Sequence, residues 1–174
     1  MKKILVANWK MNPLSEDEAL RLAKASDEKG VVVCPPDIFL KPVHNVLRKA
    51  DLGSQNVFWE NQPTSGAFTG EISLSMLKKQ GVSHTIIGHS ERRKHLGETD
   101  EMINKKVLSS LANGFKVILC VGESGVIRRE GIDKAKNFIK SQLIADLKDL
   151  VKIKSRVSNL IIAYEPIWAI SAGL

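Results

Sequence analysis

The amino-acid sequence predicts an α/β fold built on a parallel β-sheet, and two observations carry that prediction. Short apolar runs, typical of strands that are buried on both faces, alternate about six times with segments of helical periodicity. The connections between these segments are short, as in chains where each strand is followed by a helix. The sequence contains no internal repeat, low-complexity tract or interdomain linker, so we expect residues 1–174 to form a single domain.

Each expected element has its own sequence signal. The first strand covers residues 4–8, and Ser15 with Glu18 forms a capping box at the start of a helix that Gly30 ends. Apolar runs and helical spacing then predict, in order, a strand at 31–34, a helix at about 42–50, a strand within 52–59, a short helix around 73–80, a strand at 84–87, a helix at about 101–113, a strand at 116–121, the longest helix at 133–151 and a last strand at 160–163. Residues 60–71 and 122–131 are expected to be loops.

Composition narrows the class of protein. An apolar content of 43% and a charged content of 26% are typical of a globular domain, and no apolar run reaches membrane-spanning length, so we expect a cytoplasmic protein that binds no membrane. The net charge of +7 suits an anionic metabolite, whereas basic residues spread along helices without interleaved aromatics argue against nucleic acid. Cys34 and Cys120 lack CxxC spacing and are expected to be buried thiols.

Three polar residues follow the ends of three different predicted strands. Lys10 follows the first strand, His89 the fourth and Glu165 the sixth. In a barrel of parallel strands the carboxyl ends meet at one face, where active sites are built, so we expect these side chains to share one catalytic site. Taken alone, Glu165 also fits an ordinary turn carboxylate and Lys10 a surface cation, so the hypothesis depends on their convergence.

The surroundings of His89 distinguish it from the other histidines. Ser90 and Glu91 begin what looks like a capped helical turn, and the partial positive charge of a helix N-terminus disfavours an imidazolium. A neutral imidazole at this place is able to donate a hydrogen bond to a substrate oxygen. We interpret His44, His84 and His95 as structural, and because no acidic or cysteine ligand is spaced with them, we expect no metal site.

Five segments, in order along the chain, closely resemble the triosephosphate isomerase family. They are Asn8-Trp9-Lys10-Met11-Asn12, Gly66-Ala67-Phe68-Thr69-Gly70-Glu71, Ile87-Gly88-His89-Ser90-Glu91-Arg92-Arg93, Cys120-Val121-Gly122-Glu123 and Ala163-Tyr164-Glu165-Pro166-Ile167-Trp168-Ala169-Ile170. The resemblance implies a (β/α)8 fold of the TIM-barrel type. It also implies the interconversion of dihydroxyacetone phosphate and glyceraldehyde 3-phosphate through an enediolate, without a cofactor, in glycolysis and gluconeogenesis.

The resemblance assigns a role to each catalytic residue. Glu165 would be the base that moves a proton between two substrate carbons, and neutral His89 would polarise the carbonyl and stabilise the enediolate. Lys10, beside Asn8, would hold the anionic substrate, and Glu91 would be a supporting carboxylate.

The resemblance also implies a moving lid and a partner. Residues 166–171 match a lid over the substrate, in which the backbone amide of Ser171 would meet the phosphate, although the family usually has glycine there. Residues 60–74 match a loop that docks into a second subunit, with Thr69 near its tip. This match implies a homodimer.

The sequence departs from a complete barrel, which has eight strand–helix units and about 250 residues. We expect an incomplete barrel of about six parallel strands, without the loops after strands seven and eight that commonly bind phosphate. The 174-residue chain alone is therefore predicted to be at best a weak isomerase. The alternatives are a catalytically weak or inactive fragment that acts as an interaction module or needs a complementing chain, and a different phosphate-handling barrel enzyme, which the segment around Glu165 argues against.

Overall fold

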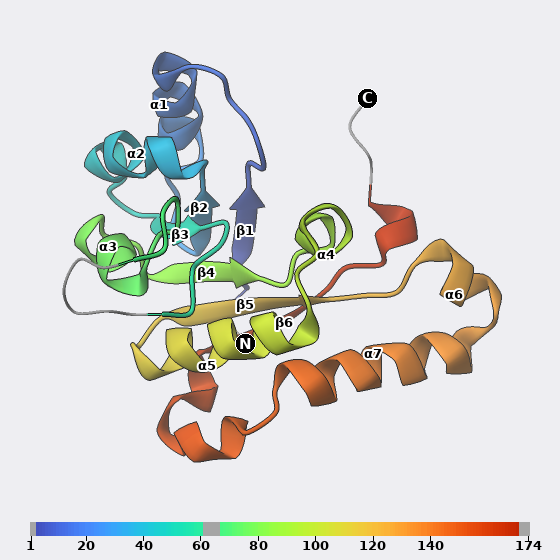
Figure 1. Ribbon diagram of the computed structural model, residues 1–174. Helices are drawn as coiled ribbons and strands as arrows, with labels where there is room; N and C mark the ends of the chain where they lie inside the picture. Colours follow the sequence, from blue (N-terminus) through green and yellow to red (C-terminus); the bar gives the residue numbers. More distant parts are fainter. Residues whose placement is uncertain (1–2, 61–66, 171–174) are drawn as a thin grey trace. The chain divides into compact units, whose positions relative to one another are not determined.

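A computed structural model describes residues 3–60 and 67–170, in which six β-strands alternate with helices (Figure 1). The chain divides into two compact units, Met1–Ile86 and Ile87–Leu174. That these units together form one domain stays a prediction.

The first unit is built on parallel strands that pair in chain order. Leu5 lies opposite Val31, Val33 opposite Leu52, and Gly53 opposite His84. The elements of this unit are β1 (Leu5–Asn8), α1 (Glu16–Ala25), β2 (Val31–Cys34), the 3-10 helix η1 (Asp37–Phe39), α2 (Leu40–Val46), β3 (Asp51–Ser54), α3 (Leu74–Lys79) and β4 (His84–Ile87), whose last residue begins the second unit.

Helix α1 begins as predicted but ends earlier. The side-chain oxygen of Ser15 accepts a hydrogen bond from the backbone N–H of Glu18 at 3.3 Å, and Ala19 and Ala23 are fully buried. The helix ends at Ala25 with Ser26 as its C-cap, so the prediction that Gly30 ends it is wrong. Gly30 has a φ of 89° and provides the turn into β2 instead.

The second unit pairs its two strands in parallel, from Val117 opposite Leu160 to Val121 opposite Tyr164. Helix α7 packs against β5 and α5, and the side chain of Asn104 donates to the carbonyl oxygen of Asp146 at 2.9 Å. The elements of this unit are α4 (Ser90–Leu96), α5 (Asp100–Ala112), β5 (Lys116–Val121), α6 (Gly125–Arg129), α7 (Ile132–Asp146), and then the 3-10 helix η2 (Leu150–Asn159), β6 (Leu160–Tyr164) and the 3-10 helix η3 (Ile167–Ala169).

Several predicted boundaries need correction. The helix predicted at 133–151 stops at Asp146, and Asp149, with a left-handed φ of 62°, precedes η2. The loop predicted at 122–131 contains α6, which Ser124 caps by accepting from the N–H of Ile127 at 3.4 Å. The strand predicted within 52–59 ends at Ser54.

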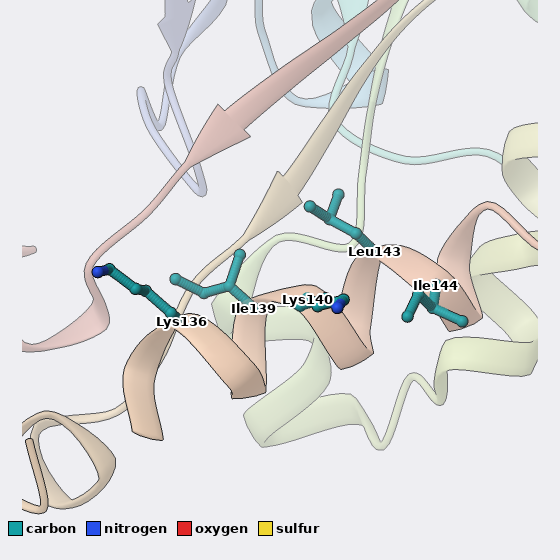
Figure 2. A pocket seen from close by; sticks show the side chains of 5 residues that line it. All are labelled: Lys136, Ile139, Lys140, Leu143 and Ile144. Atoms are coloured by element: carbon teal, nitrogen blue, oxygen red, sulfur yellow. The ribbon is translucent and has the colours of Figure 1, made fainter. Parts of the chain in front are cut away.

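The apolar stripe of α7 is only partly buried. Ala135 is 1% exposed, but Phe138 is 36% exposed. Ile144, on the opposite side of the helix from Ala135, is 65% exposed. A shallow groove of about 400 Å³ lies on this helix. Figure 2 shows the side chains that line it, Lys136 and Lys140 together with Ile139, Leu143 and Ile144.

The predicted fold class is confirmed, since six strands pair in parallel within their units and helices follow the strands. Both cysteines are free and buried, and burial raises the pKa of the Cys34 thiol to about 12. Within residues 3–60 and 67–170, no helix is both long enough and apolar enough to cross a bilayer.

Candidate active site

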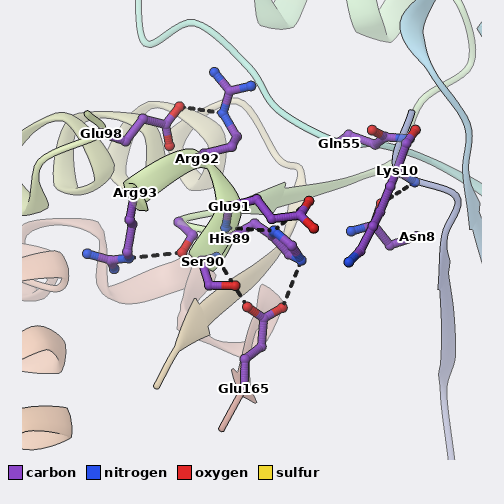
Figure 3. Close-up of polar contacts among 11 residues, drawn as sticks. Asn8, Lys10, Gln55, His89, Ser90, Glu91, Arg92, Arg93, Glu98 and Glu165 are labelled. Carbon is purple, nitrogen blue, oxygen red and sulfur yellow. Dashed lines mark hydrogen bonds and ion pairs between the residues drawn. The ribbon is translucent and has the colours of Figure 1, made fainter. Parts of the chain in front are cut away.

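Asn8 and Lys10 stand at the carboxyl end of β1, where the backbone makes an unusual turn. Lys10 has a φ of 54°, and its N–H donates to the side-chain oxygen of Asn8 at 3.0 Å (Figure 3). The side chain of Gln55 donates to the carbonyl oxygens of Lys10 at 2.8 Å and of Cys34 at 2.9 Å. A left-handed residue other than glycine costs about 1–3 kcal/mol, and such strain gathers at functional sites where the surroundings hold it. Asn8 and Gln55 provide that support.

His89 directly follows β4 and Gly88, and its ring is buried, with a side-chain exposure of 9%. It is the N-cap of α4, and its Nδ1 accepts a hydrogen bond from the backbone N–H of Glu91 at 3.3 Å. A ring nitrogen that accepts an N–H carries no proton, so this contact favours a neutral imidazole with its proton on Nε2. The Nε2 edge is therefore a hydrogen-bond donor.

Glu165 lies directly after β6, and its carboxylate faces the ring of His89. One oxygen is 3.5 Å from Nε2 of His89, and the other accepts from the backbone N–H of Ser90 at 3.3 Å (Figure 3). The Glu165 side chain is 19% exposed, so the carboxylate remains accessible to a small molecule. The structure thus brings together an acceptor carboxylate and a donor imidazole, two of the three residues that the sequence predicts to be catalytic.

Glu91 lies on the other side of the same ring. Its carboxylate is 3.7 Å from Nδ1 of His89 and its side chain is about half exposed. A cavity of about 550 Å³ opens beside this carboxylate, and Ile167 and Ile170 of the predicted lid form part of its wall. Its volume is within the range of small-molecule sites.

Glu123 is a buried carboxylate that the sequence analysis did not assign to the site. It accepts hydrogen bonds from the hydroxyl of Tyr164 at 3.0 Å and from the indole N–H of Trp168 at 2.9 Å. Burial raises the pKa of Glu123, but the hydrogen bonds from Trp168 and Tyr164 outweigh burial and lower it overall. The first turn of the predicted lid is therefore bound to the end of β5.

The remaining predicted residues lie elsewhere or outside the described part. Lys10 belongs to one compact unit and His89 and Glu165 to the other, so their meeting stays a prediction. Ser171 lies outside the described residues, as do residues 61–66 of the expected partner loop. Thr69 is described and exposed. In the described part, no three His, Cys, Asp or Glu side chains are grouped so that they could hold a metal ion.

Comparison of the sequence with known proteins identifies the family of the chain. The family model of triosephosphate isomerase matches residues 3–174. The chain is 46% identical to the triosephosphate isomerase of Thermoanaerobacter sp. (strain X514) over 99% of its own length and 69% of that protein. It is 46% identical to the enzyme of Lactobacillus delbrueckii subsp. lactis over 98% of its length and 68% of that protein. It is 45% identical to the enzyme of Cytophaga hutchinsonii over 99% of its length and 70% of that protein. The chain belongs to the triosephosphate isomerase family.

Membership of the triosephosphate isomerase family confirms the resemblance seen in the five sequence segments. It assigns the α/β chain to the TIM-barrel type and the protein to the isomerase enzymes of glycolysis. No finding favours the non-catalytic fragment over the enzyme. The individual residue roles stay predictions.

Sequence reasoning missed two polar residues that bind candidate site residues within their own units: Gln55, which binds the backbone of Lys10, and Glu123, which binds the indole of Trp168. Gln55 directly follows β3 and Glu123 follows β5, so each lies just past the carboxyl end of a parallel strand. That position was the signal that singled out Lys10, His89 and Glu165. A position after a strand predicts that a residue lies near the carboxyl end of the sheet. It does not predict that Gln55 binds the backbone carbonyl of Lys10 or that Glu123 binds the indole of Trp168.

Proposed function

We propose that this chain interconverts dihydroxyacetone phosphate and glyceraldehyde 3-phosphate by moving one proton between neighbouring carbons. The observation that carries the proposal is the pairing of a carboxylate with a neutral imidazole, Glu165 with Nε2 of His89 at 3.5 Å. Glutamate base with neutral histidine is the established chemistry of this family. Family membership supports the same reaction.

Each group has one task in the proposed reaction. The Glu165 carboxylate removes a proton from the carbon next to the substrate carbonyl, and the Nε2–H of His89 donates a hydrogen bond to the carbonyl oxygen, where negative charge develops. In the resulting enediolate, Glu165 returns its proton to the neighbouring carbon. The hydroxyl proton moves between the two substrate oxygens by way of His89, so no cofactor is consumed.

Binding of the phosphate is the second part of the proposal. Lys10, in the turn that Asn8 and Gln55 hold, supplies a positive charge for the anionic substrate. Residues 166–171 close over the substrate, and the backbone amide of Ser171 meets the phosphate. Glu91 supports the site from the Nδ1 side of His89.

The setting of the enzyme completes the proposal. We infer a single-domain subunit of a cytoplasmic homodimer, with the loop at 60–74 docking into the partner. The exposure of Thr69 near the tip of this loop supports that docking.

Proton exchange tests the proposed chemistry directly. The purified chain is incubated with dihydroxyacetone phosphate in deuterium oxide, and deuterium at the exchanging carbon is followed by proton NMR. We expect exchange by the parent chain and a loss of about 10²–10⁴-fold in Glu165→Gln, which lacks the base. Glu130→Gln is the matched control, since Glu130 is exposed on the same unit. Absence of deuterium exchange by the parent chain would overturn the proposal. Equal exchange rates in Glu165→Gln and Glu130→Gln would overturn it too.

A further inference from the structure

The backbone of Glu165 is held by the turn that follows β5. The N–H of Glu165 donates to the carbonyl oxygen of Val121 at 2.7 Å, and the N–H of Ile167 donates to that of Glu123 at 3.2 Å. Glu165 itself and the residue two positions after it are therefore joined to one short stretch of backbone, residues 121–123. The position of this stretch sets the position from which the Glu165 side chain extends.

Gly122, in the middle of this turn, lies directly against Glu165. A Cβ atom on Gly122 would be 1.7 Å from the carbonyl oxygen of Glu165 and 2.6 Å from its carbonyl carbon. Only glycine allows such a close approach of two backbones. Because there is no free space between them, a displacement of Gly122 toward Glu165 would displace Glu165 too.

Gln142 of α7 fixes the position of Gly122. Gln142 is a buried residue, with 8% of its surface exposed. Its Oε1 accepts a hydrogen bond from the buried N–H of Gly122 at 3.0 Å. The register of β5 with β6 ends at Val121, so the Gly122 N–H lies beyond the strand ladder. A buried backbone N–H without an acceptor is strongly unfavourable, so the turn would rearrange without Gln142.

We propose that Gln142 is a positioning residue for the isomerase reaction, acting on Glu165 through Gly122. This inference rests on the proposed function for its chemical meaning, because it assumes that Glu165 is the base. A catalytic group has to be held within a fraction of an ångström of its productive place, and a misplacement of about 1 Å costs roughly a hundredfold in rate. A side chain of α7 thereby influences a reaction that it does not touch.

Two variants separate the hydrogen bond from the volume of the side chain. Gln142→Met keeps the length of the side chain but removes the acceptor oxygen, whereas Gln142→Glu keeps an acceptor for the Gly122 N–H. Ser141→Ala is the matched control, because Ser141 is the exposed neighbour on the same helix. We expect Gln142→Met to lower kcat about tenfold to a hundredfold with a smaller change in KM. Gln142→Glu is expected to keep most of the parent kcat.

NMR provides a readout that does not depend on activity. In ¹⁵N-labelled chain the indole signal of Trp168, assigned with Trp168→Phe, reports on the turn through its hydrogen bond to Glu123. The ring signal of His89, assigned with His89→Gln, reports on the Glu165 carboxylate 3.5 Å away. We expect both signals to move in Gln142→Met and to lie at their parent positions in Gln142→Glu. The indole signals of Trp9 and Trp59, in the first unit, are expected to stay in place in both variants and to show that the first unit is unchanged.

The outcomes are distinct for the two proposals. If no variant or parent shows isomerase activity, the proposed function fails, and the NMR signals alone decide the positioning role. If Gln142→Met leaves the Trp168 and His89 signals unchanged, or if Gln142→Glu behaves like Gln142→Met, Gln142 does not position Glu165.

Discussion

The backbone N–H of Glu91 donates a hydrogen bond to Nδ1 of His89 at 3.3 Å, while Nε2 of the same ring faces the Glu165 carboxylate. The two ring nitrogens therefore have opposite roles, one accepting and one donating. A backbone amide keeps its proton at all physiological pH values. The tautomer of this histidine is thus favoured by a backbone group that keeps its proton.

This contact predicts which tautomer His89 adopts. In the ¹⁵N NMR spectrum of histidine-labelled chain at pH 8, we expect the His89 ring to carry its proton on Nε2, because Nδ1 is occupied as an acceptor. His89→Gln assigns the signal by removing it, and the exposed His95 serves as the reference for a ring in solvent. A His89 ring protonated on Nδ1 would contradict the prediction.

The hydrogen bonds to Glu123 predict an acid-sensitive contribution to stability. Since the Glu123 pKa in the folded chain lies below its ordinary 4.5, these bonds stabilise the fold above that pH, and their contribution is lost as the pH falls through the lowered value. We expect Glu123→Gln to lower the free energy of unfolding at pH 7 but to cost less at pH 3, measured by urea titration. Glu130→Gln is the surface control, and an equal cost of Glu123→Gln at both pH values would contradict the assignment.

Asp146 predicts a pH dependence of the opposite sign. It is fully buried, and among the described residues its Oδ1 has no hydrogen-bond partner, while Arg93 pairs with its other oxygen at 2.6 Å and also with Asp100. Burial, and to a lesser extent the charge of Asp100, raise the Asp146 pKa from 3.8 to about 7 despite Arg93. The folded chain therefore retains a proton that the unfolded chain releases between these two values, and stability falls as the pH rises through that interval.

Urea titrations at pH 5 and pH 8 test this second dependence. We expect the parent chain to lose stability relative to Asp146→Asn between these pH values, because asparagine does not titrate. Asp133→Asn, at an exposed position on the same helix, is expected to show no such change. If the difference between parent and Asp146→Asn is the same at both pH values, Asp146 is already ionised at pH 5.

Gly53 in β3 lies so close to β2 that the sheet has no room for a side chain at this position. A Cβ atom there would be 2.5 Å from the Cys34 sulfur and 2.9 Å from a methyl carbon of Val32. We expect Gly53→Ala to lower the free energy of unfolding by about 1–3 kcal/mol, as overpacking of a core does. The cost is expected to be smaller in a Cys34→Ala background, where the nearest atom is gone, and equal costs in the two backgrounds would refute the clash with the sulfur.

Sequence reasoning succeeded where a local pattern determines the outcome. The run of β-branched residues at Val31–Val33 and the apolar run at Leu160–Ala163 became strands, and Ser15 caps its helix as expected. The pairing of His89 with Glu165 also followed from a simple rule, that polar residues after parallel strands meet at one edge.

The features that sequence reasoning missed depend on contacts between distant residues or on very short elements. Helix α6 has five residues, too few to show a period, and its start depends on the cap at Ser124. Gln142 is an ordinary polar residue of an amphipathic helix until the backbone of Gly122 is placed against it. The left-handed φ of Lys10 has no sequence signal either, since lysine does not favour that conformation.

The strained lysine turn has a consequence for the order in which binding ability arises. Gln55 ties the carbonyl oxygens of Lys10 and Cys34 together, and it comes directly after β3. A chain in which the third strand is still unpaired therefore lacks the hydrogen bond from Gln55 that helps to hold Lys10 in its left-handed conformation. Under the proposed function, affinity for a negatively charged metabolite therefore requires the chain up to Gln55 to be in place and does not arise from β1 and β2 alone.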